Sequence, residues 1–426
     1  MRTRAFLSTR ALPPSHLIPF TSRRPPPSPH NQLALLTRLN DEVLDRRGRP
    51  ADPASLSLSA TLLEHNPEAY TAWNFRREAL GPVLAAGGAA AVEAAAAELA
   101  LTEKALLRNP KSYAAWHARR WVVGHRLASL AAEVRLVDAL LDVDARNFHA
   151  WAHRGWACDL GCIPAADQLF AAAARIEADF SNYSAWHARS ALLARMHWEK
   201  VGGGRSGGGG GGGDDGGEEP PTTLAALLSS APAGPSSSGG DCGGGGDRGT
   251  HPTAKPTTLP LPVLAAECAL VRAATFTDPT DQAPWFYQRW LVGQVVAGAR
   301  AAVAAEEEGG GGDKVAQARR AEAIAAADAA LAAEAAACEE LLAAEPDRAL
   351  CKWPLLALAH LADARAGLAA LVKGGEQGGR GGGGGEDATP PPAKALYDEL
   401  AALDPMRRGF YEDAAAGRAA VVVPEV

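Results

Sequence analysis

A motif of aromatic, tryptophan and arginine residues recurs along this 426-residue chain and constrains its fold more than any other feature. Trp116, Trp151 and Trp186 are each 35 residues apart. A period of this length is typical of stacked helical hairpins, in which each unit needs its neighbours to bury its apolar face. The five copies that align up to the Trp are NPEAYTAW (66–73), NPKSYAAW (109–116), DARNFHAW (144–151), DFSNYSAW (179–186) and DPTDQAPW (278–285).

The residue types within one period predict a helical hairpin. Upstream of the motif, apolar residues recur at spacings of three and four, as at Val134, Val137 and Leu141, which indicates a first helix. An Asn or Asp seven residues before the Trp, followed by Pro in three copies, predicts the end of that helix. The aromatic residue, the Trp and the Arg then share one stripe of a second helix. We expect the large rings to pack between hairpins and the Arg to bond helix-end carbonyls or stack on the indole.

The predicted fold class is therefore all-α, a right-handed superhelix (α-α solenoid) of stacked helical hairpins. Folded segments are expected over 36–198 (repeats 1 to 4), 260–300 (repeat 5), 336–370 (a degenerate repeat 6) and 394–420 (a C-terminal helical segment). Gly-rich or Pro-rich insertions are expected over 199–259, 301–335 (with a helix) and 371–393, around glycine tracts at 207–213, 309–312 and 381–385. Residues 1–35 have an Arg, Ser and Pro bias that fits a disordered arm, a targeting segment or a wrongly assigned gene start.

Composition excludes several classes of protein. The formal net charge is −7 and no basic stripe is visible, which argues against a nucleic-acid-binding protein. No uninterrupted apolar run approaches the ~20 residues of a membrane span. The six cysteines form no CxxC pair and are too sparse for a disulfide framework, so a reducing, cytoplasmic location is expected.

The Trp-x-x-Arg form distinguishes these repeats from tetratricopeptide repeats, in which Leu-Gly follows the early Trp. The motifs resemble the repeats of protein prenyltransferase α subunits. That resemblance implies a crescent of hairpins wrapped around a β subunit, and it places the catalytic zinc in the β subunit and no cofactor in this chain. Within the family, NPKSYAAWHARRW, DARNFHAWAHRGW, KWP (352–354) and LDPMR (403–407) are most similar to Rab geranylgeranyltransferase α subunits.

The resemblance implies transfer of geranylgeranyl from geranylgeranyl diphosphate to C-terminal cysteines of Rab GTPases, which an escort protein delivers. The nearest alternative is the α subunit shared by farnesyltransferase and type I geranylgeranyltransferase, which acts on CaaX proteins. A helical adaptor that retains the scaffold without the enzyme is a third reading. The fifth copy departs from the pattern, because Gln288 stands where the Arg is expected and Arg289 follows it.

Two clusters of candidate site residues lie between the repeated anchors. From the residues alone, Lys111 is a solvated surface lysine, but the resemblance implies that it reaches the diphosphate with Tyr113 beside it. In the same way, Asn147 is a helix N-cap and His149 a partly buried polar residue from the sequence alone. The resemblance instead implies that they face the active-site cavity. His149 and His153 are four residues apart, but no third ligand has comparable spacing, so no metal site is expected.

Overall fold

The computed structural model describes residues 29–46, 52–202, 258–308, 314–374 and 393–418. Every regular element within these ranges is a helix, which confirms the all-α prediction. Contacts divide the chain into two compact units, residues 1–128 and 129–426, which we call unit 1 and unit 2. The three glycine tracts and residues 1–28 lie outside the described residues.

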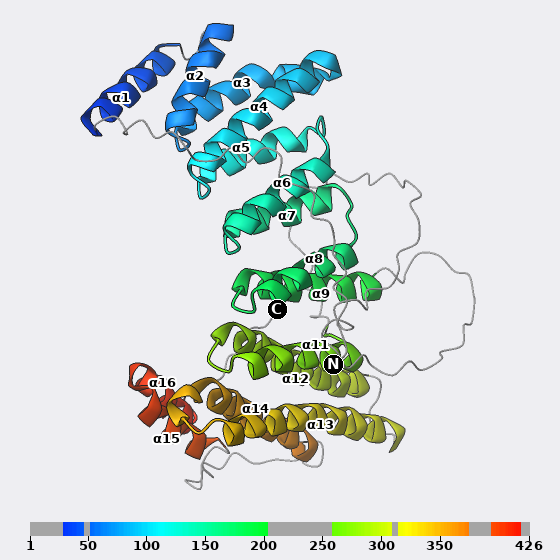
Figure 1. Ribbon diagram of the computed structural model, residues 1–426. Coiled ribbons are helices and arrows are strands. Elements are labelled where there is room, and N and C mark those ends of the chain that lie inside the picture. The colour runs from blue at the N-terminus through cyan, green and yellow to red at the C-terminus, as the bar shows by residue number, and fades with distance from the viewer. Residues whose placement is uncertain (1–28, 47–51, 203–257, 309–313, 375–392, 419–426) are drawn as a thin grey trace, which may run out of the picture. The chain divides into compact units, whose positions relative to one another are not determined.

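Unit 1 contains two complete hairpins preceded by one helix (Figure 1). Its helices are α1 (Pro29–Asp45), α2 (Pro53–His65), α3 (Tyr70–Ala86), α4 (Gly88–Arg108) and α5 (Tyr113–Gly124). Helices α2 and α3 form the first hairpin, and α4 and α5 form the second. Helix α1 begins at Pro29, and its buried residues, Leu39 and Val43, lie within the expected folded range that starts at residue 36.

Unit 2 stacks its own hairpins in chain order, from green to red in Figure 1. Its α-helices are α6 (Leu130–Val143), α7 (Phe148–Leu160), α8 (Ala165–Ala178), α9 (Tyr183–Gly202), α11 (Leu261–Thr277), α12 (Gln282–Glu308), α13 (Lys314–Ala344), α14 (Lys352–Gly374), α15 (Lys394–Leu403) and α16 (Arg408–Ala415). Two short 3₁₀ turns, Arg348–Leu350 and Pro405–Arg407, precede α14 and α16. Helix α13 was expected within an insertion, but its buried Ile324, Leu331 and Leu341 make it the first helix of the sixth hairpin.

The turn inside each hairpin forms as the sequence predicts. In all five copies the first helix ends directly before the Asn or Asp of the motif, which is the C-cap residue. The side chain of that residue then accepts the backbone N–H two residues further on, as between Asn109 and Lys111 (3.1 Å). This local bond offers the backbone an alternative to helix and so fixes the break. The same bond is made by Asn66, Asp144, Asp179 and Asp278.

The motif Trp closes its own hairpin. Trp116 is buried on α5, and its indole N–H donates to the carbonyl of Pro110 in the preceding turn at 2.9 Å. The donor always lies six residues after the acceptor, which explains why the distance between the turn residue and the Trp is constant. The equivalent pairs are Trp73 with Pro67, Trp151 with Ala145, Trp186 with Phe180 and Trp285 with Pro279, at 2.7 to 3.0 Å.

We predict that Trp116→Phe lowers the free energy of unfolding by about 1–3 kcal/mol more than Trp121→Phe does. Both variants make the same change of ring, but Trp116 is buried and Trp121 only partly buried, and only the first variant leaves the Pro110 carbonyl without its donor. Trp121 lies on the same helix outside the motif and is the matched control. Urea denaturation measures both values, and equal losses would contradict the assigned bond.

The aromatic residue three positions before the Trp behaves differently from the expectation. Tyr70, Tyr113 and Phe148 were expected to pack between hairpins, but their residues are 55%, 62% and 54% exposed. Each is the first residue of its helix, as Tyr183 also is, so position at the helix end permits exposure but does not by itself decide it. Only the fourth copy packs as expected, with the Tyr183 ring 5.7 Å from Phe286.

The motif Arg is buried and joins helices through polar groups. Arg119 donates to the carbonyl of Leu99 and to the hydroxyl of Thr102, both at 3.0 Å. A carbonyl bond therefore forms, but to the interior of α4 and not to a helix end as expected. Arg189 instead pairs with Glu267 on the first helix of the next hairpin, at 2.7 and 2.6 Å. At this junction a buried ion pair, which the sequence analysis did not predict, therefore joins one hairpin to the next. Arg76 pairs with Glu98 in the same way, and Arg154 bonds Asp138 of its own hairpin.

Glu267→Gln is expected to cost about 3–5 kcal/mol of unfolding free energy, because it leaves the buried Arg189 charge without its counter-charge. Glu64→Gln is the control, since Glu64 pairs with Lys104 on the exposed surface and should cost less than about 1 kcal/mol. Chemical denaturation measures both costs. Similar costs would show that the buried pair is not what ties these hairpins together.

The last hairpins of unit 2 enclose a buried histidine. His360 on α14 has no hydrogen-bond partner for its Nε2 within the described part of the chain. Burial and the nearby Arg289 lower its pKa to about 4. By length and composition, the segment Lys352–Val372 of this helix could cross a membrane, but it also packs as a core helix, with Leu355 and Leu361 buried against neighbouring helices.

Because of His360, we expect the free energy of unfolding to depend on pH. The folded state holds His360 neutral, whereas the unfolded chain protonates it below about pH 6.5, so its contribution is complete above that pH and is lost as the pH falls towards 4. Between pH 7.5 and pH 5, wild type should therefore lose about 2 kcal/mol more unfolding free energy than His360→Gln. Denaturant titrations at the two pH values test this, and parallel losses would contradict it.

Candidate functional site

The candidate site residues all lie where the second helix of a hairpin begins. A polar residue four positions before the Trp caps that helix in four of the five hairpins, and it bonds the first free backbone N–H groups. These caps are Ser112, Asn147, Asn182 and Asp281. Exposed side chains next to a cap are thereby held beside the positive end of a helix.

Lys111 and Tyr113 flank one such cap in unit 1. Ser112 is fully buried, accepts the backbone N–H of Ala115 at 3.1 Å and donates to the Pro67 carbonyl of the preceding hairpin at 3.2 Å. Lys111 and Tyr113 are both exposed. A rigid buried cap therefore presents an ammonium group and a phenol at the N-terminal end of α5, an arrangement suited to binding an anion.

In unit 2 Asn147 is itself the cap at the corresponding position, and His149 lies two residues after it. The Asn147 side chain is buried and accepts the backbone N–H groups of His149 and Ala150 at 3.1 and 3.2 Å. The helix-cap interpretation of Asn147 is therefore confirmed. His149 is 8% exposed, and its ring lies 3.9 Å from that of Phe148, which is exposed. His149 is thus a buried ring next to an exposed one.

The neighbouring His153 has a structural partner. Its Nε2 lies 2.7 Å from Glu133 Oε1, and both side chains are buried. Within the described ranges, no three or more His, Cys, Asp and Glu side chains are grouped so that they could hold a metal ion.

The structure groups the four candidates into two pairs. Lys111 and Tyr113 belong to unit 1, at one end of α5, and Asn147 and His149 belong to unit 2, at one end of α7. In the first pair the cap residue Ser112 lies between Lys111 and Tyr113. In the second pair Asn147 is itself the cap of the helix that carries His149. Each pair is therefore a local feature of one repeat.

One repeated position was missed by the sequence analysis. A buried Glu or Gln lies 18 residues before the Trp in four copies. In two of them it pairs with a motif Arg, as Glu98 does with Arg76 and Glu267 with Arg189, whereas Glu133 bonds His153 and Gln168 bonds the carbonyl of Ile163. Aligning the repeats backwards from the Trp would have revealed it, because an acidic residue at a buried register position needs a partner. The four residues are Glu98, Glu133, Gln168 and Glu267.

The cap residues also join hairpins that are distant in sequence. Ser181 Oγ donates to Asp281 Oδ2 at 2.6 Å, between residues 100 positions apart. The Arg189 to Glu267 pair spans the same junction. The fourth and fifth hairpins are therefore direct neighbours, although the segment 203–257 separates them along the chain.

Comparison with known proteins supports the resemblance drawn from the motifs. The family described as protein prenyltransferase alpha subunit repeat matches residues 53–81, 95–126 and 130–160. Geranylgeranyl transferase type-2 subunit alpha from Homo sapiens and from Mus musculus is 58% identical over 36 residues. That segment covers 8% of this chain and 6% of each relative.

A solved structure has the same fold over most of the chain. A chain of Candida albicans protein geranylgeranyltransferase-I, complexed with GGPP, matches with a TM-score of 0.52 at 15% identity. The match covers 91% of both chains. The predicted fold, a solenoid of prenyltransferase-type helical hairpins, is confirmed.

Proposed function

This chain carries protein prenyltransferase alpha subunit repeats, and we propose that it is the α subunit of a heterodimeric protein geranylgeranyltransferase of the Rab type. The observation that carries the proposal is the position of Lys111. It lies inside a matched repeat, is exposed, and stands beside the capped N-terminus of α5. A cation there would meet the diphosphate of geranylgeranyl diphosphate.

The chemistry of prenyl transfer gives this cation a role. When a cysteine thiolate attacks the isoprenoid carbon, the carbon–oxygen bond breaks and negative charge develops on the departing diphosphate. A preorganised ammonium group and helix N-terminus stabilise that charge more in the transition state than in the ground state. The thiolate would be held by a zinc ion, which we propose belongs to the β subunit.

The remaining candidates would support the reaction from the α side. Tyr113 shares the exposed end of α5 with Lys111, and its phenol can donate a hydrogen bond to a phosphate oxygen. Asn147 and His149 lie in the next repeat along the chain, where the capped end of α7 and the Phe148 ring would border the peptide and ordered water.

The type-2 relatives support the Rab class of substrate, since they are 58% identical over the segment they share with this chain. We therefore propose that the complex works in the cytoplasm and receives Rab GTPases from an escort protein. Co-expression with a candidate β subunit, followed by transfer assays on a Rab protein with its escort and on a CaaX peptide, tests this. Transfer to the CaaX peptide alone would reassign the chain to the shared α subunit, and failure of any β subunit to co-purify would favour an adaptor.

Lys111→Ala is predicted to lower kcat about 10²-fold in an intact heterodimer, because one preorganised charge contact to the leaving group is lost. Lys104→Ala is the matched control, since Lys104 is an exposed lysine of the same hairpin that pairs with Glu64. Single-turnover kinetics measure the chemical step, and gel filtration confirms that the heterodimer is intact. Equal turnover in the two variants would remove the assigned role from Lys111.

A further inference from the structure

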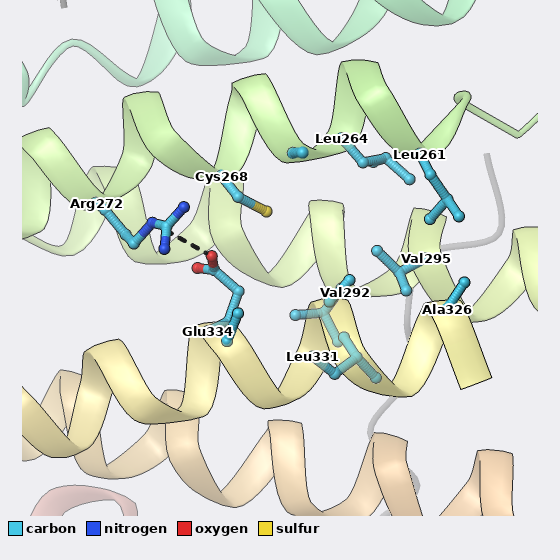
Figure 2. A pocket seen from close by; sticks show the side chains of 12 residues that line it. Leu261, Leu264, Cys268, Arg272, Val292, Val295, Ala326, Leu331 and Glu334 are labelled. Atoms are coloured by element: carbon cyan, nitrogen blue, oxygen red, sulfur yellow. Dashed lines mark ion pairs between the residues drawn. The ribbon is translucent and has the colours of Figure 1, made fainter. Parts of the chain in front are cut away.

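A cavity of about 190 Å³ lies between α11, α12 and α13 in unit 2 (Figure 2). Its walls are mostly aliphatic, and one end carries polar side chains. The cavity contains none of the residues proposed for prenyl transfer, so a ligand bound in it would be independent of that function. The aliphatic part is lined by Leu261, Leu264, Val292, Val295, Leu331 and the alanines at 265, 326, 330 and 333.

The alanine-rich sequence of α13 explains why the space exists. Ala326, Ala330 and Ala333 recur at spacings of four and three, so they share one face of the helix. Methyl groups on this face cannot fill the distance to α11. Leu264 and Leu331 are almost completely buried, whereas Leu261 is 41% exposed. The cavity therefore has a firmly packed floor and an opening to the surface.

The polar end of the cavity is formed by Arg272 on α11 and Glu334 on α13. Arg272 Nε lies 3.5 Å from Glu334 Oε1, the ion pair drawn in Figure 2. Gln288 donates to the other carboxyl oxygen at 3.1 Å, and burial raises the pKa of Glu334. A separation of 3.5 Å exceeds the usual 2.7–3.2 Å of an N–H···O hydrogen bond. One hydroxyl oxygen can therefore accept from Arg272 and donate to Glu334 at normal distances.

We propose that this cavity binds a small neutral alcohol, with its aliphatic body along the alanine face and its hydroxyl between Arg272 and Glu334. The volume of the cavity limits the size of the ligand. An apolar cavity of about 150 Å³ accepts benzene, so this cavity should accept a ligand of about seven to nine non-hydrogen atoms. The charges at the polar end favour a neutral head group. The Arg272–Glu334 pair has no net charge, so a carboxylate or amine head would be attracted by one partner, repelled by the other and stripped of its hydration, whereas a hydroxyl meets no such repulsion.

The test uses the purified full-length chain and 1-heptanol as the probe, followed by isothermal titration calorimetry. We expect saturable binding with a Kd on the order of 1 mM, typical of so small a ligand. Cys268 lines the cavity, but burial raises the pKa of its thiol strongly, so its alkylation is too slow to report on occupancy. Variants that fill the cavity identify the site instead.

Matched variants decide whether the cavity is responsible. Ala330→Leu fills the space and should weaken heptanol binding at least tenfold, whereas Ala329→Leu, on the exposed side of the same helix, should leave it unchanged. Ala326→Leu provides a second filling variant if the first does not fold, as judged by circular dichroism. Absence of saturable binding, or equal affinity in the filled and control variants, would overturn the proposal.

The head group is tested separately with heptanoate and heptylamine. Both should bind at least fivefold more weakly than heptanol at pH 7.5. Arg272→Met should remove most of the preference for heptanol over heptylamine but not the preference over heptanoate, because Glu334 remains in the cavity wall. Tighter binding of heptanoate or heptylamine than of heptanol would overturn the assignment of a neutral ligand.

Discussion

The hydrogen bond from each motif indole to a turn carbonyl is the interaction on which the rest of the structure depends. It joins the start of the second helix to the turn that ends the first, at 2.7 to 3.0 Å in all five copies. Because the donor is a large buried ring, one residue both satisfies a turn carbonyl and fills the space between two helices. The C-cap and N-cap hydrogen bonds of the same turn add to this bond, which already fixes the turn backbone against the second helix.

A second layer of interactions joins one hairpin to the next, and it is electrostatic. Arg189 is buried together with Glu267, and the phenol of Tyr287 donates to the same carboxylate at 2.8 Å. Such a pair recovers its desolvation cost only when its geometry is well satisfied. It therefore favours one particular stacking of the hairpins over others that would bury similar apolar area.

The sequence predicted the local structure better than the connections between repeats. The turns, the Trp burial and the Asn147 cap are set by spacing and residue type, so they could be predicted. The exposure of Tyr113 and the role of α13 could not, because both depend on which helix end or neighbouring helix a residue meets. Of the candidate site, the sequence located Lys111 and His149 within their repeats. Their surroundings are set by tertiary packing, which periodicity does not encode.

The junction between the fourth and fifth hairpins has a consequence for how such chains vary. Ser181 bonds Asp281 and Arg189 pairs with Glu267, so residues on the described helices themselves join the two hairpins here. Each doubling of a connecting segment costs only about 0.6 kcal/mol in closure entropy. The length of this connecting segment therefore has little effect on the free energy of unfolding, and selection for stability constrains it only weakly. Tens of residues can be gained or lost here while every hairpin keeps its neighbours. The principal effect of a longer segment is slower folding, because the contacts across the junction form between residues further apart in sequence.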